Sequence, residues 1–105
     1  MWTIFKDFDF AAAHFIPEHP GKCRNLHGHN YRVRVHVTAS RLDRLDMVVD
    51  FALLKRLTRD VVDRFDHRLL NELEPFDQIA PTAERIAEHI AVEVGRRLHE
   101  AEEID

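Results

Sequence analysis

Residues 23–30, CRNLHGHN, combine two histidines separated by one glycine with the only cysteine of the chain. In an extended segment, residues two apart point to the same side, so His27 and His29 share a face. His14 ends an earlier segment with strand-like alternation, and antiparallel pairing of the two segments would bring the three imidazoles together. Three neutral imidazoles with an open fourth position are the donor set of catalytic zinc. The alternative interpretation is a turn with exposed histidines.

Cys23 has three possible roles, and its spacing from the histidines does not decide between them. It could complete a Cys-His₃ structural zinc site, or it could act beside the metal as an acid/base, because a nearby divalent cation favours the thiolate. It could also be an inert buried thiol. Lys22, Arg24 and Asn25 are polar neighbours in a loop, and they argue against burial.

Asp66 directly precedes His67, and this pair is a second candidate for proton-transfer chemistry. A carboxylate that accepts a hydrogen bond from an imidazole fixes the tautomer of the ring and raises its basicity, which suits a general acid/base. Adjacent Asp-His pairs are common in proteins, so the residues alone do not assign a catalytic role.

Two strands must position the histidines. The segment from Ile4 to Phe15 alternates weakly, and the segment from Tyr31 to Val37 alternates cleanly, which is typical of a half-buried antiparallel strand. Two prolines and a glycine between them predict a loop. The short apolar run at 47–49 is compatible with a further strand.

Two helices are predicted after the strands. Asp50 is a good N-cap for the first, and Pro81 with Thr82 suits the start of the second. Their apolar stripes are Leu53, Leu54, Leu57, Val61 and Phe65, and then Ile86, Ile90, Val94 and Leu98. Residues 66–81 form a long loop between the helices, and such loops are often functional. The order of elements indicates an α+β fold.

Length and charge limit the possible functions. A chain of 105 residues suits a single domain, residues 1–105. With 15 Lys and Arg against 19 Asp and Glu it has no basic stripe, so we expect no nucleic-acid partner. No apolar run approaches the ~18 residues of a membrane span, so we expect no membrane partner. The charged start MWTIFKDFDF is unlike a signal peptide, and we expect a cytoplasmic protein.

The order of several motifs resembles the 6-pyruvoyltetrahydropterin synthase family over nearly the whole chain. These motifs are FDFAAAHF, CRNLHGHNYRVRV, MVVDF, FDHRLLN and APTAERIA. The most specific is CxxxHGH, whose short spacing resembles the bacterial 6-carboxytetrahydropterin synthase branch, which acts in queuosine and 7-deazapurine biosynthesis.

The resemblance implies an activity and a set of site residues. The implied enzyme is a zinc-dependent lyase that converts 7,8-dihydroneopterin triphosphate to 6-carboxytetrahydropterin with release of acetaldehyde and triphosphate. The resemblance assigns the zinc ligands to His14, His27 and His29. It assigns the catalytic base to Cys23 and a proton relay to Asp66 with His67.

Two other functions stay open beside this lyase. A pyruvoyl-forming synthase leaves the side chain of the substrate intact. A protein whose zinc is structural would bind only a pterin or a partner.

The resemblance also implies a tunnelling fold, in which a four-stranded antiparallel sheet packs two helices on one face and subunit sheets join into a barrel. Family members are typically homohexamers with active sites between subunits, so Asp66 and His67 are expected to serve the zinc of a neighbouring chain.

The sequence departs from the family pattern after the second helix. In the family a final strand there carries a glutamate that anchors the pterin, whereas this chain stops at HEAEEID. Ile104 and Asp105 would be the first residues of that strand. Thr82 and Glu84 match the PTxE motif of the family, although Thr82 equally suits a helix cap.

Overall fold

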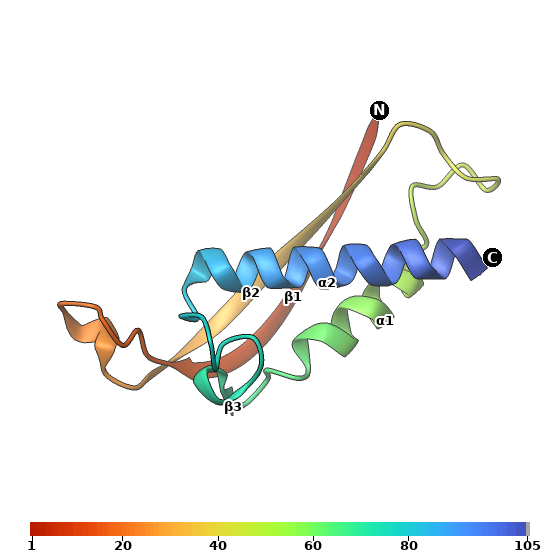
Figure 1. The fold of residues 1–105 in the computed structure, drawn as a ribbon. Helices are drawn as coiled ribbons and strands as arrows, with labels where there is room; N and C mark the ends of the chain where they lie inside the picture. The colour runs from red at the N-terminus through yellow and green to blue at the C-terminus, as the bar shows by residue number, and fades with distance from the viewer. Residues whose placement is uncertain (105) are drawn as a thin grey trace.

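The computed structural model describes residues 1–104 and has the α+β architecture expected from the sequence (Figure 1). The molecule is elongated, with principal extents of 51 × 23 × 19 Å. Its elements in chain order are β1 (Trp2–His14), η1 (Lys22–Arg24), β2 (His27–Ala39), α1 (Phe51–Val62), β3 (Arg68–Leu69), η2 (Leu70–Glu72) and α2 (Ala83–Ile104).

The two long strands form an antiparallel hairpin. Their register runs without interruption from Trp2 opposite Ala39 to His14 opposite His27, so β2 begins earlier than the alternation from Tyr31 predicted. The even-numbered residues of β1 and the odd-numbered residues of β2 therefore share one side of the sheet, which we call the inner face. The opposite residues form the outer face.

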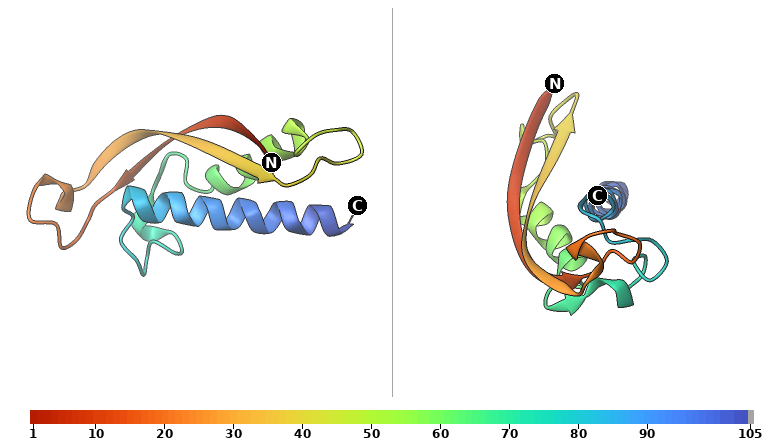
Figure 2. Two further views of the ribbon diagram at one scale, coloured as in Figure 1. Left: turned by 90° about the horizontal axis from the view of Figure 1, so that it is seen from above. Right: turned by 90° about the vertical axis from the view of Figure 1, so that its left-hand side faces the viewer.

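Both α-helices cover the inner face, as expected (Figure 2). The N-cap prediction for α1 is confirmed, because the Asp50 carboxylate accepts a hydrogen bond from the Ala52 N–H at 2.8 Å. The predicted stripe of α2 is buried in full, and Phe65 is buried just beyond the end of α1. The core cluster comprises Phe10, Ala12, Val49, Leu54, Leu57, Val61, Val62, Phe65, Leu70, Phe76, Ile86, Ile90, Val94 and Leu98.

The sheet differs from the expected four antiparallel strands. Among the described residues it has three strands in the order β2-β1-β3, and β3 pairs parallel to β1 through only two residues, Arg68 and Leu69. These residues lie within 66–81, which the sequence predicted to be a loop. The chain turns tightly after α1, runs beside the end of β1, and enters η2 at Leu70, which leaves no length for a longer strand.

The apolar run at 47–49 is not a strand, and the prediction there was wrong. The Asp43 carboxylate accepts hydrogen bonds from the N–H groups of Leu45 at 2.8 Å and Met47 at 3.1 Å. These bonds hold the segment in a turn that includes the left-handed residue Asp46, so the Met47 N–H is not free to pair with a strand. Val49 is buried in the core instead.

The C-terminal residues do not begin a strand within the described part of the chain. Helix α2 continues through Ile104, which corrects the expectation for that residue, and Asp105 lies outside the described residues. Neither helix of residues 1–104 combines the length and the apolar character needed to cross a bilayer.

Candidate metal centre

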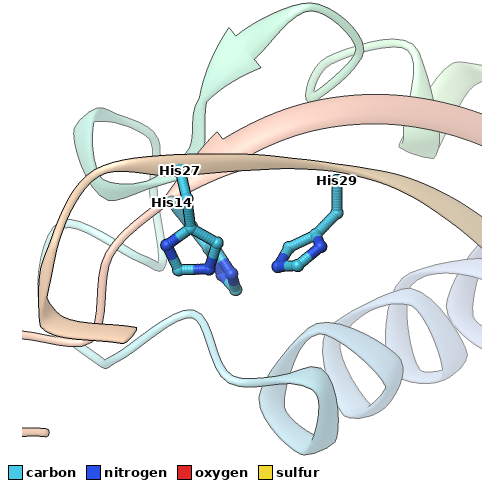
Figure 3. Close-up of side chains that lie close together, drawn as sticks. All are labelled: His14, His27 and His29. Carbon is cyan, nitrogen blue, oxygen red and sulfur yellow. The ribbon is translucent and has the colours of Figure 1, made fainter. Parts of the chain in front are cut away.

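Three histidines meet at the end of the hairpin, as the alternation predicted. His14 is paired with His27 across the strands, and His29 is the next inner-face residue of β2. One ring nitrogen of each lies within 4.8 Å of the others, and the ring centroids are 4.6 to 5.1 Å apart. Figure 3 shows the three rings converging on one space below the strands. His14 is buried, His27 half-buried and His29 exposed, so the cluster is open to solvent on one side.

Two main-chain carbonyls fix how the cluster presents its nitrogens. The Nδ1 atom of His14 lies 2.8 Å from the Pro81 carbonyl oxygen, and that of His27 lies 2.7 Å from the Asn25 carbonyl oxygen. A carbonyl oxygen only accepts, so each Nδ1 carries the proton and each Nε2 keeps its lone pair. Metal-binding histidines usually have this arrangement, and the residues therefore fit a divalent metal ion.

Burial also keeps His14 available as a ligand. Desolvation holds the pKa of His14 below its usual value, against the opposing effect of the Pro81 hydrogen bond, and the neighbouring His27 and His29 lower it further. The neutral imidazole, which is the metal-binding form, is therefore favoured near neutral pH.

Cys23 is exposed in η1, within the loop that joins the two strands, which agrees with the expectation that the thiol is not buried. Its carbonyl accepts a hydrogen bond from the Ile16 N–H at 2.7 Å, which closes the base of this loop. Among the described residues, the group close enough to share a metal contains the histidines and not Cys23. The structure thus gives no support to a Cys-His₃ site.

Asp66 and His67 form the contact that their adjacency suggested. Nδ1 of His67 lies 3.0 Å from Oδ1 of Asp66, and the same oxygen accepts the Ala11 N–H at 2.9 Å. The Ala11 hydrogen bond, followed by the one from His67, lowers the pKa of Asp66, so the carboxylate stays ionised. His67 has a left-handed backbone, with φ of 60°, and its own N–H donates to the Ala11 carbonyl. A non-glycine residue in this conformation is held there by its surroundings.

The pair and the histidine cluster lie on opposite faces of the sheet. The His67 side chain is 82% exposed, and it borders a shallow depression of about 490 Å³. That depression is lined by the small outer-face residues Ala11, Ala13 and Gly28, and also by His29 of the cluster. The cluster residues belong to the inner face by their register, and His29 is the member that reaches the same depression as His67.

Several residues beside the cluster were not singled out from the sequence. The carbonyls of Asn25 and Pro81 carry no sequence signal, because any residue has one. Tyr31 is two residues after His29 and is therefore the next residue on the inner face. This spacing could have predicted from the sequence that Tyr31 lies beside the histidines. Thr82 acts as a helix cap, because its hydroxyl accepts the Arg85 N–H at 3.2 Å, and Glu84 is exposed in the first turn of α2.

Comparisons with known proteins agree over most of the chain. Residues 3–105 match the family model described as 6-pyruvoyl tetrahydropterin synthase. The chain is 46% identical over 92 residues to a 6-carboxy-5,6,7,8-tetrahydropterin synthase of Synechocystis sp., covering 83% of this chain and 70% of the relative. It is 37% identical over 115 aligned positions to the Rickettsia conorii protein of the same name, covering 93% and 83%. A solved structure of Caenorhabditis elegans 6-pyruvoyl tetrahydropterin synthase superposes with a TM-score of 0.80 at 32% identity, covering 89% of this chain and 76% of that chain.

Proposed function

Because the chain belongs to the 6-pyruvoyl tetrahydropterin synthase family, we propose that it is a 6-carboxytetrahydropterin synthase, a lyase of queuosine and 7-deazapurine biosynthesis. The observation that carries this proposal is the open cluster of His14, His27 and His29, in which the Nδ1 atoms of His14 and His27 are bound to carbonyls and leave Nε2 with its lone pair. The Synechocystis and Rickettsia relatives bear the carboxy name, and this favours the carboxy product.

The proposed substrate is 7,8-dihydroneopterin triphosphate. With uptake of one water, it yields 6-carboxytetrahydropterin, acetaldehyde and triphosphate. The pterin ring gains the two electrons that its side chain loses, so no external reductant is needed. One side-chain carbon stays on the ring as the carboxylate, and the other two leave as acetaldehyde.

The three histidines would hold zinc, to which a neutral imidazole set is well suited. Bound there, the ion would act as a Lewis acid for the side-chain oxygens of the substrate. The chain itself supplies the orientation, because the Pro81 and Asn25 carbonyls hold His14 and His27 at Nδ1 and leave Nε2 available as the ligand atom.

Proton transfer is assigned to Cys23 and to the Asp66-His67 pair. Cys23 would remove a carbon-bound proton from the substrate side chain, and its exposure on the loop next to β2 supports this role. His67 would handle the opposite protonation, with Asp66 fixing its tautomer through the 3.0 Å contact at Nδ1.

The active site is proposed to form between chains of a homo-oligomer, a hexamer by family resemblance, with subunit sheets joined into a barrel. Two features support this. The His67 side chain is exposed at the outer-face depression, and within residues 1–104 the outer edge of β2 has no neighbouring strand. A second chain placed against this sheet could bring its own pair to the cluster.

A pyruvoyl-forming synthase is the second candidate, because the C. elegans neighbour bears that name. A protein that binds only zinc and a pterin is the third. The deciding experiment is mass spectrometry of the products after zinc-loaded protein is incubated with dihydroneopterin triphosphate, with His27→Ala as the control. We expect 6-carboxytetrahydropterin and acetaldehyde. A 6-pyruvoyl product would establish the second candidate, and unchanged substrate in a protein that binds pterin would establish the third.

A further inference from the structure

Tyr31 is held against the histidine cluster by its neighbours on the inner face. It is paired across the strands with Phe10, and the two rings are stacked with centroids 4.9 Å apart and planes 13° apart. Its ring meets His29 and His14 edge-on, with centroids 5.6 and 6.0 Å away. The phenol is half-buried, so stacking and burial together restrict where its hydroxyl can lie.

The hydroxyl of Tyr31 lies beside the ligand atom of His14. It is 3.3 Å from Nδ1 and 3.4 Å from Nε2 of that ring. The Nδ1 proton is directed to the Pro81 carbonyl at the shorter distance of 2.8 Å. Nε2 therefore has only a lone pair to offer, and the phenol at 3.4 Å lies at the long limit of a hydrogen bond to it.

These contacts confine the His14 ring from two sides. The Pro81 carbonyl holds it at Nδ1, and the phenol lies along the edge that contains both nitrogens. At 3.4 Å the hydroxyl makes too long a bond to Nε2 to compete strongly with a metal ion. Both contacts are long, so the phenol bounds this edge of the ring without a strong hydrogen bond to either nitrogen.

We propose that Tyr31 is a positioning residue of the metal centre, which holds His14 in its ligating orientation and whose hydroxyl changes hydrogen-bond partner when a metal binds. This inference rests on the proposed role of the three histidines as metal ligands. It adds Tyr31 to the metal centre, and it assigns an effect on metal binding to the hydroxyl as well as to the ring. If Tyr31 served only to fill the inner face, phenylalanine would replace it without consequence.

The wild-type protein contains its own probe, because Tyr31 is its only tyrosine. We would titrate the metal-free full chain with Co²⁺ and follow the near-ultraviolet tyrosine absorption together with the visible Co²⁺ bands. We expect a tyrosine difference signal that saturates with the cobalt signal. The only tryptophan, Trp2, is at the far end of β1 and serves as the internal reference.

Variants then separate the hydroxyl from the ring. Tyr31→Phe should weaken Co²⁺ and Zn²⁺ binding about 3- to 10-fold, because the His14 ring gains freedom that metal binding must then remove. It should also change the visible Co²⁺ spectrum. Tyr31→Leu should weaken binding further, because the stacked ring is lost as well. Thr38→Val is the matched control. It removes a hydroxyl from the same strand, one that contacts Thr3 at 2.8 Å far from the cluster, and it should bind cobalt as wild type does.

Each outcome decides a different question. A folded Tyr31→Phe protein with wild-type affinity and an unchanged cobalt spectrum would overturn the inference. So would cobalt binding to wild type without a tyrosine signal, and this readout still decides if the variant does not fold. In both cases the metal centre would stand. Failure of the wild-type protein to bind cobalt or zinc would overturn the metal centre and this inference together.

Discussion

His14 and His27 each have one ring nitrogen bound to a main-chain carbonyl, and this arrangement determines what the cluster can do. If an imidazole could change tautomer freely, it would offer a metal the protonated nitrogen part of the time. The Pro81 and Asn25 carbonyls remove that freedom, and they come from segments on two sides of the cluster. The open side, near the exposed His29, is left for a substrate.

The first prediction at this scale concerns metal content. The wild-type protein should carry about one zinc per chain, and His27→Ala should lose it, because two imidazoles are a weak set for a zinc site. Metal content measured by atomic emission after gel filtration tests this. His36→Ala is the matched control, because it removes a histidine from the same strand on the outer face and should retain zinc. Full zinc content in His27→Ala would remove His27 from the ligand set.

The second prediction concerns the free thiol. Because Cys23 is exposed and outside the histidine group, it should react with iodoacetamide while zinc is bound. Cys23→Ala should keep its zinc and its fold while kcat falls by ~10²–10⁴, the usual loss for a general acid/base. Zinc loss from a folded Cys23→Ala protein would instead make the thiol a ligand.

At the scale of elements, the contact between α2 and the segment after α1 includes an ionisable group. His89 of α2 lies edge-on to Phe65 and Phe76, with centroids 5.5 and 5.7 Å away. Its Nε2 is buried, and within residues 1–104 it has no hydrogen-bond partner. Burial lowers the pKa of His89, and the positive charge of Arg64 lowers it further. The negative charges of Glu93 and Glu74 raise this pKa but do not cancel the effect of burial.

The third prediction follows from the direction of this shift. A histidine whose pKa is lower in the folded state binds its proton first in the unfolded state, so folding stability falls as the pH drops below the usual value of about 6.5. His89→Phe removes this group, and the free energy of unfolding should then fall less between pH about 7.5 and about 5.5. Urea unfolding with a chelator present measures it, and exposed His36→Gln is the control. An equal fall in wild type and His89→Phe would contradict the assignment.

At the scale of the whole molecule, the sheet carries the histidine cluster on one face and the Asp66-His67 pair on the other. The outer face is not covered by helices, and its charges are already paired, as in the contact of Arg34 with Asp7 at 2.8 Å. A surface of this kind can meet another copy of the chain without leaving unpaired charges. Because this face carries the exposed His67, it supports the proposal that sites are shared between subunits.

The fourth prediction tests this sharing by complementation. His27→Ala chains should lack the metal centre but keep the Asp66-His67 pair. His67→Ala chains should keep the metal centre but lack a complete pair. Each protein alone should be nearly inactive. Mixed oligomers formed by co-expression should recover activity at up to about a quarter of the sites if cluster and pair come from different chains. The matched control mixes His27→Ala with His14→Ala, which damages the same cluster in both chains and should recover nothing. Absence of recovery in the first mixture would place the whole site within one chain.

The sequence by itself determined the parts of this protein that depend on local periodicity. Alternation predicted both long strands, and a register that pairs Phe10 with Tyr31 necessarily pairs His14 with His27. The Asp50 cap and the stripe of α2 followed from the same kind of pattern. These features depend on residues close in the chain, and a single sequence contains that information.

Only the tertiary structure decided the features that depend on contacts between distant segments. The Asp66 carboxylate is bound to Ala11 across 55 residues, and His14 is bound to Pro81 across 67. No periodicity encodes such pairs. They fix the parallel β3, the tautomer of His14 and the face on which His67 lies. The turn at Asp43 similarly outweighed the strand-like composition of residues 47–49, because a side-chain hydrogen bond took the N–H that a strand would need.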